Sequence, residues 1–273
     1  MPDVLAIIQG RMGSSRLPGK ILLDIGGKPM LQHVIERTRR AASLDSVLFA
    51  TSTDPSDDPV EQFCASIQTP CYRGSLQDVL DRYYQPALSN HARLIVRITA
   101  DCPLVDPALI DATVELVAAS DPSQPVDFAA NRLPPPYGRS FPIGLDVEVC
   151  RFAALERAWR ESTSKHYREH VMPYLYEGVT LHPLSGNISS GVSPNGFNIV
   201  QLNHVPDYGS LRWTVDTPED LLFMREIFAR LGDKADFTWQ DVLAILQKEP
   251  DLARINSSIQ HKTFYDVDER HTP

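Results

Sequence analysis

The chain begins with an apolar strand that leads directly into a glycine-rich, cationic loop. Residues 4–8 are all apolar, a run short enough for one strand with both faces buried. The loop that follows combines glycines, hydroxyls and cations: Gln9, Gly10, Arg11, Met12, Gly13, Ser14, Ser15, Arg16, Leu17, Pro18, Gly19 and Lys20. Backbone N–H groups of such a loop can turn toward phosphate oxygens, and Arg and Lys neutralise phosphate charge. This opening predicts an α/β fold that binds a polyphosphate.

The spacing of the glycines excludes the two commonest phosphate-binding fingerprints. No Gly-Lys-Ser/Thr follows at the spacing of the Walker motif, and the glycines do not match the dinucleotide-binding pattern. After the loop, strands are expected over residues 46–51, 71–72 and 93–99, with helices around 30–35 and over 59–66. This alternation predicts a mostly parallel, Rossmann-like central sheet flanked by helices, with ligands beyond the C-terminal ends of its strands.

The second half of the chain differs from the first in its local composition. Prolines mark an irregular segment from residue 121, and strands are then expected over 126–131, 145–149 and 197–202. Helices are expected over residues 152–161, 165–177, 220–231 and 238–255, with a loop or hairpin over 179–193. We predict one domain over residues 1–257: a nucleotide half (1–120), an acceptor and dimer segment (121–210), and a closing strand and helices (211–257). A polar tail, expected to be poorly ordered, covers 258–273.

Composition excludes several classes of partner. A net charge of −9 argues against a general nucleic-acid binder, although a local cationic pocket is compatible with it. No apolar run reaches the length of a membrane span, and the N-terminus lacks a signal-peptide pattern. The four cysteines form no Cys-x-x-Cys pair, which is typical of buried thiols in a reducing compartment. These features together predict a cytoplasmic enzyme with neither a membrane nor a nucleic-acid partner.

Two aspartates stand at the ends of expected strands. Asp101 follows the strand 93–99 and precedes a proline turn, a place suited to a divalent cation such as Mg²⁺, which prefers one or two carboxylates plus phosphate oxygens. Asp106 precedes Pro107 and is expected to cap a helix. Asp216 ends a predicted strand, and Thr217-Pro218 begins a helix. Because both carboxylates lie at strand ends, Asp101 and Asp216 are predicted to converge.

Three segments resemble the cytidylyltransferases that make CMP-activated acidic sugars. That family comprises the CMP-Kdo and CMP-sialic acid synthetases and the spore-coat polysaccharide biosynthesis (SpsF-like) proteins. The similar segments are Arg11-x-Gly13-Ser14-x-Arg16-Leu17-Pro18-Gly19-Lys20, Arg73-Gly74-Ser75-x-x-Asp78-Val79-Leu80-x-Arg82 and Val215-Asp216-Thr217-Pro218-Glu219-Asp220. The resemblance runs from residue 3 to about 231 and implies the fold of the nucleotide-diphospho-sugar transferases, with a homodimer.

The resemblance also implies roles for individual residues. The catalytic residues would be Arg16, Lys20, Asp101 and Asp216, with Mg²⁺ held by the two aspartates. Nucleotide-binding residues would be Gln9, Gly10, Arg11, Met12, Gly13, Ser14, Ser15, Arg16, Lys20, Arg73, Gly74, Ser75 and Asp101. Sugar-binding residues would be Arg139, Asp146, Glu169 and His170. Simpler structural interpretations stay open: Ser75 as a helix cap, Asp146 and Glu148 facing solvent, and residues 168–170 on a solvated helix face.

The implied reaction couples CTP to an ulosonic-type acidic sugar and yields a CMP-sugar and pyrophosphate. GTP, or a sugar phosphate or phosphonate acceptor, remains an alternative. A glycosyltransferase would usually carry Asp-x-Asp after a strand, whereas Cys102-Pro103 follows Asp101 here. A nucleotide-binding regulator would not need both carboxylates together with Arg16 and Lys20.

Overall fold

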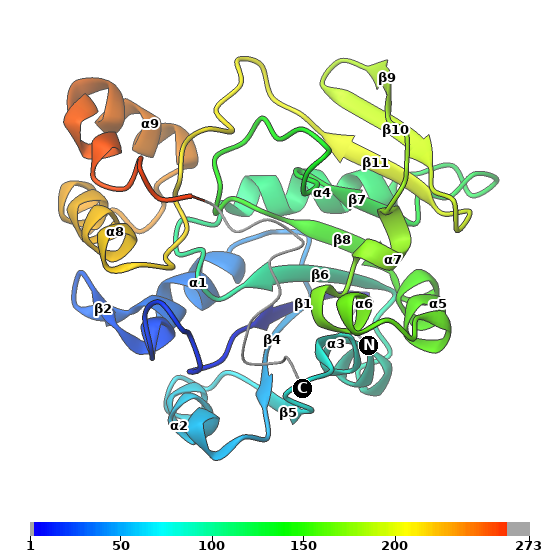
Figure 1. Ribbon diagram of the computed structural model, residues 1–273, viewed down its shortest axis with the longest axis horizontal. Coiled ribbons are helices and arrows are strands. Elements are labelled where there is room, and N and C mark those ends of the chain that lie inside the picture. Colours follow the sequence, from blue (N-terminus) through cyan, green and yellow to red (C-terminus); the bar gives the residue numbers. More distant parts are fainter. Residues whose placement is uncertain (1–2, 261–273) are drawn as a thin grey trace.

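A computed structural model describes residues 3–260 of the chain, which form one large mixed sheet covered on both faces by helices (Figure 1). The strands are β1 (Val4–Gln9), β4 (Ser46–Ser52), β5 (Cys71–Gly74), β6 (Leu94–Thr99), β7 (Phe128–Ala130), β8 (Glu148–Arg151), β9 (His182–Ser185), β10 (Ile188–Val192) and β11 (Asn198–Leu202). Their order in the sheet is β5-β4-β1-β6-β8-β7-β11-β10-β9. Only β8 and β10 run against the other described strands of this sheet, so the mostly parallel sheet is confirmed.

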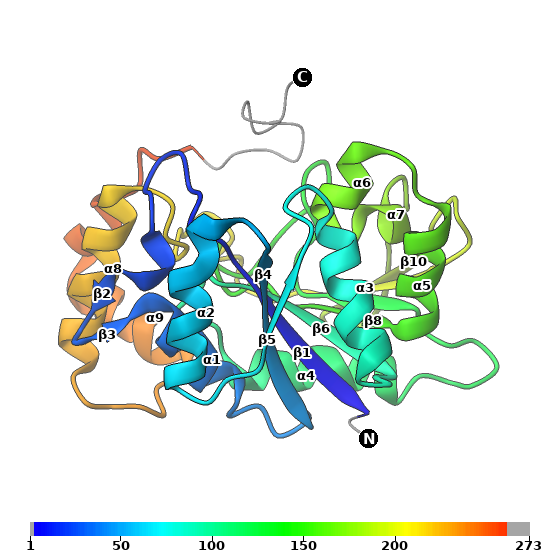
Figure 2. The ribbon, with the colours of Figure 1, turned by 90° about the horizontal axis from the view of Figure 1, so that it is seen from below.

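The helices form two layers. The helices of eight or more residues are α1 (Met30–Thr38), α2 (Asp58–Ser66), α3 (Val79–Ser89), α4 (Pro107–Ala118), α5 (Phe152–Glu161), α8 (Pro218–Leu231) and α9 (Trp239–Lys248). The shorter elements are α6 (Lys165–His170), α7 (Pro173–Tyr176), η1 (Lys20–Leu22), η2 (Pro55–Asp57), η3 (Pro250–Arg254) and the hairpin strands β2 (Asp24–Ile25) and β3 (Lys28–Pro29). Figure 2 shows α1, α2, α8 and α9 on one side of the sheet and α3, α5, α6 and α7 on the other.

Strand β1 lies at the centre of this arrangement. Ala6 and Ile8 pack into the core beneath α1 and α4, whereas Leu5 and Ile7 pack into the core beneath α3 and α5. Because its two neighbours in the sheet, β4 and β6, are parallel to it, both of its faces are covered by helices. The run is continuously apolar because both faces of the strand are buried. The loop after Gln9 begins at the C-terminal edge of the parallel strands.

Two expected helices are interrupted. The predicted helix 165–177 is wrong, because α6 ends at His170, Val171 has φ of 73° and Pro173 begins α7. The predicted helix 238–255 is also wrong, because α9 ends at Lys248 and Pro250 begins the short helix η3. Proline cannot donate the backbone hydrogen bond of a continuing helix and restricts the residue before it.

Two other local predictions also need correction. The segment before Asp216 is extended but forms no ladder; Val215 N donates to Asp101 O at 2.9 Å, and Trp213 N to Ile143 O at 2.6 Å. The N-cap of α3 is Asp78, whose carboxylate accepts from the N–H of Asp81 at 2.9 Å, whereas Ser75 caps the preceding turn. The predicted cap Asp106 and the predicted hairpin over 179–193 are confirmed.

Residues 3–260 contain no helix that is both long and apolar enough to cross a membrane. Of the four cysteines, all are free thiols, and Cys64, Cys102 and Cys150 are buried as predicted, whereas Cys71 is half-buried. The predicted tail lies mostly outside the described residues, which end at residue 260.

Candidate active site

The glycine-rich loop is held in place at both ends. Gly10 lies where β1 and β6 approach closely: a Cβ there would stand 2.6 Å from the Cβ of Ala100. Gly19 adopts φ of 69°, a conformation that favours glycine, and its N–H donates to Met12 O at 3.0 Å. The N–H of Met12 donates to the buried carboxylate of Asp57 at 2.7 Å. These contacts explain why Met12, a predicted nucleotide contact, faces the protein.

Asp57 links the loop to the end of β4. Besides the N–H of Met12, its carboxylate accepts from the hydroxyl of Thr51 at 2.9 Å, and from the N–H of Ser52 at 3.1 Å and the hydroxyl of Ser52. The buried carboxylate thereby satisfies several donors at the C-terminal edge of the sheet. The sequence analysis assigned Asp57 no role. Its position in a polar loop after a strand does not distinguish it from the neighbouring polar residues of that loop.

Lys20 joins the two aspartates predicted to converge. Its ammonium group donates to Asp101 Oδ2 at 2.8 Å, to Asp216 Oδ1 at 2.8 Å and to the carbonyl oxygen of Val215 at 2.9 Å. Burial alone would lower the pKa of Lys20, but the two carboxylates outweigh it and raise this pKa to about 12. The convergence of Asp101 and Asp216, which are 115 positions apart in the sequence, is therefore present in the structure.

The second oxygen of Asp216 is also occupied by cations. Arg16 Nη2 lies 3.1 Å and Arg212 Nη2 2.9 Å from Asp216 Oδ2. Burial would raise the pKa of Asp216, but Lys20, Arg16 and Arg212 hold it well below its usual range. Arg212 in turn is anchored by Asp220, which is fully buried. The sequence analysis assigned Arg212 no role.

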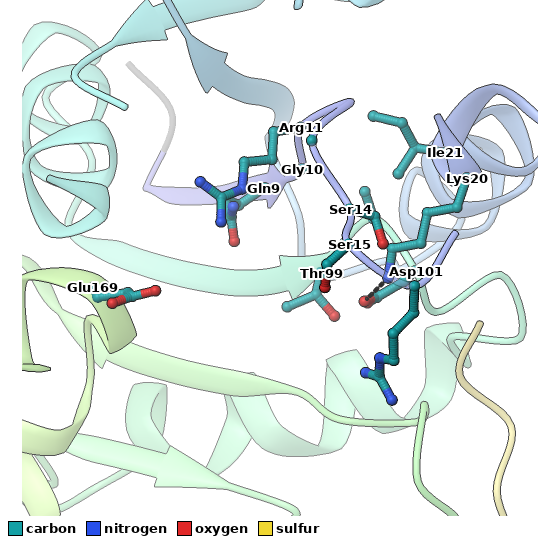
Figure 3. Close-up of a pocket in the computed structure, with 13 residues that line it drawn as sticks. Gln9, Gly10, Arg11, Ser14, Ser15, Lys20, Ile21, Thr99, Asp101 and Glu169 are labelled. Carbon is teal, nitrogen blue, oxygen red and sulfur yellow. Dashed lines mark hydrogen bonds and ion pairs between the residues drawn. The ribbon is translucent and has the colours of Figure 1, made fainter. Parts of the chain in front are cut away.

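A cavity of about 260 Å³ opens under the loop (Figure 3). Figure 3 shows Lys20 and Asp101 at one end of this cavity and Glu169, from α6, across it, with Gln9 and Arg11 between them. Its lining residues are Gln9, Gly10, Arg11, Gly13, Ser14, Ser15, Arg16, Lys20, Ile21, Thr99, Ala100, Asp101 and Glu169. Most residues predicted to contact the phosphates therefore line one cavity, and Asp216 adjoins it through Lys20 and Arg16.

A second cavity of about 180 Å³ adjoins the first, since Gln9, Arg11 and Glu169 line both. It is lined by Gln9, Arg11, Leu76, Gln77, Val79, Arg82, Arg97, Lys165, Glu169 and His170. Arg82 is fully buried, and its Nε and Nη1 have no hydrogen-bond partner among the described residues. Burial, together with the charge of Arg11, lowers the pKa of Arg82. A buried guanidinium with unused donors points to an acceptor supplied by a ligand.

The turn predicted to face the nucleotide contributes different residues from those expected. Arg73 is turned toward α2, with Nη1 2.7 Å from Asp58 and 2.8 Å from Glu61. Gly74 leaves room for Arg82, because a Cβ at Gly74 would lie 2.8 Å from Arg82 Cγ. Arg73, Gly74 and Ser75 line neither of the two cavities; the residues that follow them in the same turn do.

The predicted sugar-binding residues divide into two groups. Glu169 lines both cavities and His170 the second. Burial and nearby positive groups lower the pKa of His170 to about 4, so its imidazole is neutral near pH 7. Arg139 instead pairs with Asp146 at 3.1 Å, and neither residue lines the two cavities.

The interpretation of Asp146 and Glu148 as solvent-facing acids is wrong. Asp146 Oδ2 also lies 3.4 Å from Arg132 Nε, so this carboxylate is held between two arginines. Glu148 is 4% exposed and pairs with Arg97 of β6. The alternation of apolar and acidic residues suggested a solvent face, but β8 lies inside the sheet between β6 and β7.

The site could hold a divalent cation only with help from a ligand. Residues 3–260 contain no group of three or more His, Cys, Asp or Glu side chains suited to a metal ion. Two carboxylate oxygens and one carbonyl oxygen nevertheless converge within 2.9 Å of a single cation, the Lys20 ammonium. Asp101 and Asp216 therefore fit Mg²⁺, which takes one or two carboxylates and completes its shell with phosphate oxygens and water.

Similarity to known proteins agrees with this geometry. Residues 5–208 match a family model described as cytidylyltransferase. The chain is 32% identical to an uncharacterized protein of Methanocaldococcus jannaschii, over 97% of this chain and 99% of that protein. It is 30% identical to the spore coat polysaccharide biosynthesis protein SpsF of Bacillus subtilis, over 93% of this chain and 98% of SpsF.

A shorter match and one solved structure complete the comparison. A 3-deoxy-manno-octulosonate cytidylyltransferase of Geobacter sulfurreducens is 38% identical over 116 residues, which are 42% of this chain and 46% of that enzyme. The structure of a cytidylyltransferase from Leptospira borgpetersenii superposes with a TM-score of 0.81 at 28% identity, covering 95% of this chain and 99% of that one. The chain therefore belongs to the cytidylyltransferase family.

Proposed function

We propose that this protein transfers the cytidylyl group of CTP to an acidic, ulosonic-type sugar and releases pyrophosphate. The observation that carries the proposal is the convergence of Arg16, Lys20, Asp101 and Asp216 beside the cavity under the glycine-rich loop. Nucleotidyl transfer needs a positioned α-phosphate and neutralised charge more than it needs covalent chemistry from the protein. The names of SpsF and of the octulosonate cytidylyltransferase support the sugar substrate and a role in polysaccharide synthesis.

In the proposed reaction, one pair of residues stabilises the leaving group and another pair binds the metal. A sugar hydroxyl oxygen attacks the α-phosphorus, the bond to the β-phosphate breaks, and the hydroxyl proton passes to solvent. Arg16 and Lys20 would neutralise the charge that builds up on the departing pyrophosphate, together with the loop N–H groups. Asp101 and Asp216 would hold Mg²⁺, which would supply positive charge to the phosphates and make the sugar hydroxyl more acidic.

The second cavity supports a pyrimidine base as part of the substrate. Leu76 and Gln77 of the turn and Val79 at the start of α3 line this cavity. Arg82 offers two donors, Nε and Nη1, that have no partner among residues 3–260. Cytosine presents two adjacent acceptors, its N3 and O2, which suit these donors. Lys165, Glu169 and His170 of α6 also line this cavity and would meet the acceptor, and the charge of Lys165 favours a carboxylate there.

The test is pyrophosphate release with CTP, GTP, UTP or ATP, each combined with ulosonic acids or sugar phosphates, with Mg²⁺ and with EDTA. We expect release with CTP only when an acidic sugar is present, and none in EDTA. Asp101→Asn should abolish turnover, whereas Asp251→Asn, which changes an 85% exposed carboxylate, should not. Equal release with another nucleotide or with a sugar phosphate would contradict the substrate assignment. Full activity in EDTA would contradict the role of the metal.

The proposal includes a homodimer. The edge hairpin β9–β10 carries two exposed apolar side chains, Leu184 at 64% and Val192 at 62% exposure. An exposed sheet edge with apolar side chains favours pairing with another chain. Light scattering coupled to gel filtration should give twice the 30.5 kDa mass of the chain, and Leu184→Glu should reduce it. A monomer at every concentration would refute the dimer.

A further inference from the structure

All three donors of the Lys20 ammonium are used within the protein. The acceptors are Asp101 Oδ2, Asp216 Oδ1 and the carbonyl oxygen of Val215, at 2.8, 2.8 and 2.9 Å. An ammonium has three N–H donors and no acceptor, so this environment satisfies it completely. Lys20 is only 9% exposed. Its positive charge therefore occupies the point at which the oxygens of two separate loops converge.

The surroundings of this point disfavour a second cation as long as the Lys20 ammonium occupies it. The other oxygen of Asp216 is held by Arg16 at 3.1 Å and by Arg212 at 2.9 Å. Within residues 3–260, the other oxygen of Asp101 accepts only from the Cys102 thiol, at 3.5 Å. A divalent ion bound by both carboxylates would stand beside the Lys20 ammonium, and like charges at such a distance repel strongly in a partly buried site.

The cavity offers Lys20 an alternative position. Lys20 lines the cavity together with Ser14, Ser15 and Arg16 of the loop, where phosphate oxygens of a nucleotide would lie. A phosphate can replace the two carboxylates as a partner for the ammonium, because it also offers several charged oxygen acceptors. The long, flexible stem of lysine allows such an exchange without movement of the loop.

We propose that Lys20 holds the cation position of the nucleotide-free enzyme and leaves it to the divalent metal only when nucleotide phosphates take up its ammonium group. This inference rests on the proposed nucleotidyl transfer for the identity of the phosphate ligand. In the absence of nucleotide, Lys20 keeps Asp101 and Asp216 together in spite of their mutual repulsion. Metal and nucleotide then bind with positive coupling, and by linkage each raises the affinity of the protein for the other.

The test measures Mn²⁺ binding to the whole protein without nucleotide, from the electron paramagnetic resonance signal of free Mn²⁺. Wild-type protein should bind Mn²⁺ weakly. Lys20→Met should bind it about tenfold or more tightly, since it removes a positive charge adjacent to the two carboxylates. Adding Asp216→Asn to Lys20→Met should remove this gain. Lys28→Met is the control, because Lys28 is exposed and pairs with Glu36 in the β3–α1 region.

The outcomes separate this inference from the proposed function, because no turnover is measured. Equal Mn²⁺ affinity in wild type and in folded Lys20→Met would overturn the inference, whatever the substrate proves to be. Circular dichroism checks that Lys20→Met is folded. If it is not, the water-proton relaxation rate of wild-type samples is measured instead. A rate enhanced with Mn²⁺ and CTP, but not with Mn²⁺ alone, supports the exchange of the Lys20 ammonium for the metal. Full enhancement with Mn²⁺ alone, or none with both ligands, refutes it.

Discussion

Replacement of Asp220 by alanine should destabilise the protein far more than the loss of a helix cap. Asp220 is fully buried and accepts from Arg212 Nε and Nη2 at 2.8 Å each, from Asn256 Nδ2 at 2.9 Å, and from the N–H groups of Asp216 and Thr217 at 3.0 and 3.1 Å. Nearby donors outweigh burial and lower the pKa of Asp220, so it is ionised at neutral pH. Its removal takes from the buried charge of Arg212 an ion-pair partner that is itself fully buried, while the pair with Asp216 stays.

The magnitude follows from two separable contributions. Loss of one partner of a buried ion pair costs about 3–5 kcal/mol. Loss of the capping box that Asp220 forms with Thr217 costs about 1 kcal/mol. Because Arg212 retains Asp216, the two effects together should lower the free energy of unfolding by about 3–5 kcal/mol. For a chain of this size the melting temperature should fall by roughly 6–20 °C.

Helix α9 supplies a matched control. It begins with the same capping box, formed by Thr238 and Asp241, but the side chain of Asp241 is 36% exposed and pairs with exposed Lys234. Asp241→Ala should therefore cost only about 1 kcal/mol. Urea denaturation of wild type, Asp220→Ala and Asp241→Ala measures the difference. Equal losses in the two variants would refute the conclusion that the buried contact with Arg212 dominates.

Three further predictions concern one residue that lines the site and two that support it from behind. Gly74→Ala should raise KM for CTP about tenfold with a smaller change in kcat. The added Cβ displaces Arg82 and so weakens the charged hydrogen bond proposed between Arg82 and the nucleotide. An unchanged KM would show that Arg82 does not contact the nucleotide. Asp57→Ala should lower the free energy of unfolding by about 1–3 kcal/mol in urea, because the N–H of Met12 and its other donors lose a buried acceptor; a loss below half of that would contradict the role. The lowered pKa of His170 predicts stability that is present above pH 6.5 and lost as the pH falls toward 4, since only the unfolded chain then takes up the proton. His170→Phe should reduce this acid-induced fall in the free energy of unfolding by about 1–2 kcal/mol, a figure that allows for the partial exposure of His170. If urea denaturation gives the same pH dependence for wild type and variant, the buried, neutral state of His170 is refuted.

Much of the site was accessible from local sequence patterns. The loop from Gln9 to Lys20 combines strand, glycines and cations within a short stretch, so its position at the strand end and its lining of a cavity follow from neighbouring residues. The predictions failed where a local pattern had two meanings. Residues 145–149 alternate like a half-exposed strand, yet Glu148 is buried against Arg97 of the neighbouring strand β6. Arg73 was predicted to contact the nucleotide, yet it pairs with Asp58 and Glu61 of α2.

What the amino-acid sequence determined by itself was the order of strands and helices, the glycine-rich and cationic character of the loop, and the family, because these depend on periodicity and on residues adjacent in the chain. Only the tertiary structure decided which side chains meet. Arg82 keeps two donors, Nε and Nη1, without a partner among residues 3–260 because α3 buries it beside Gly74. Lys20 becomes the shared partner of Asp101 and Asp216 because three distant segments end at one edge of the sheet. Charge and burial at these positions depend on neighbours far away in sequence, which no local pattern specifies.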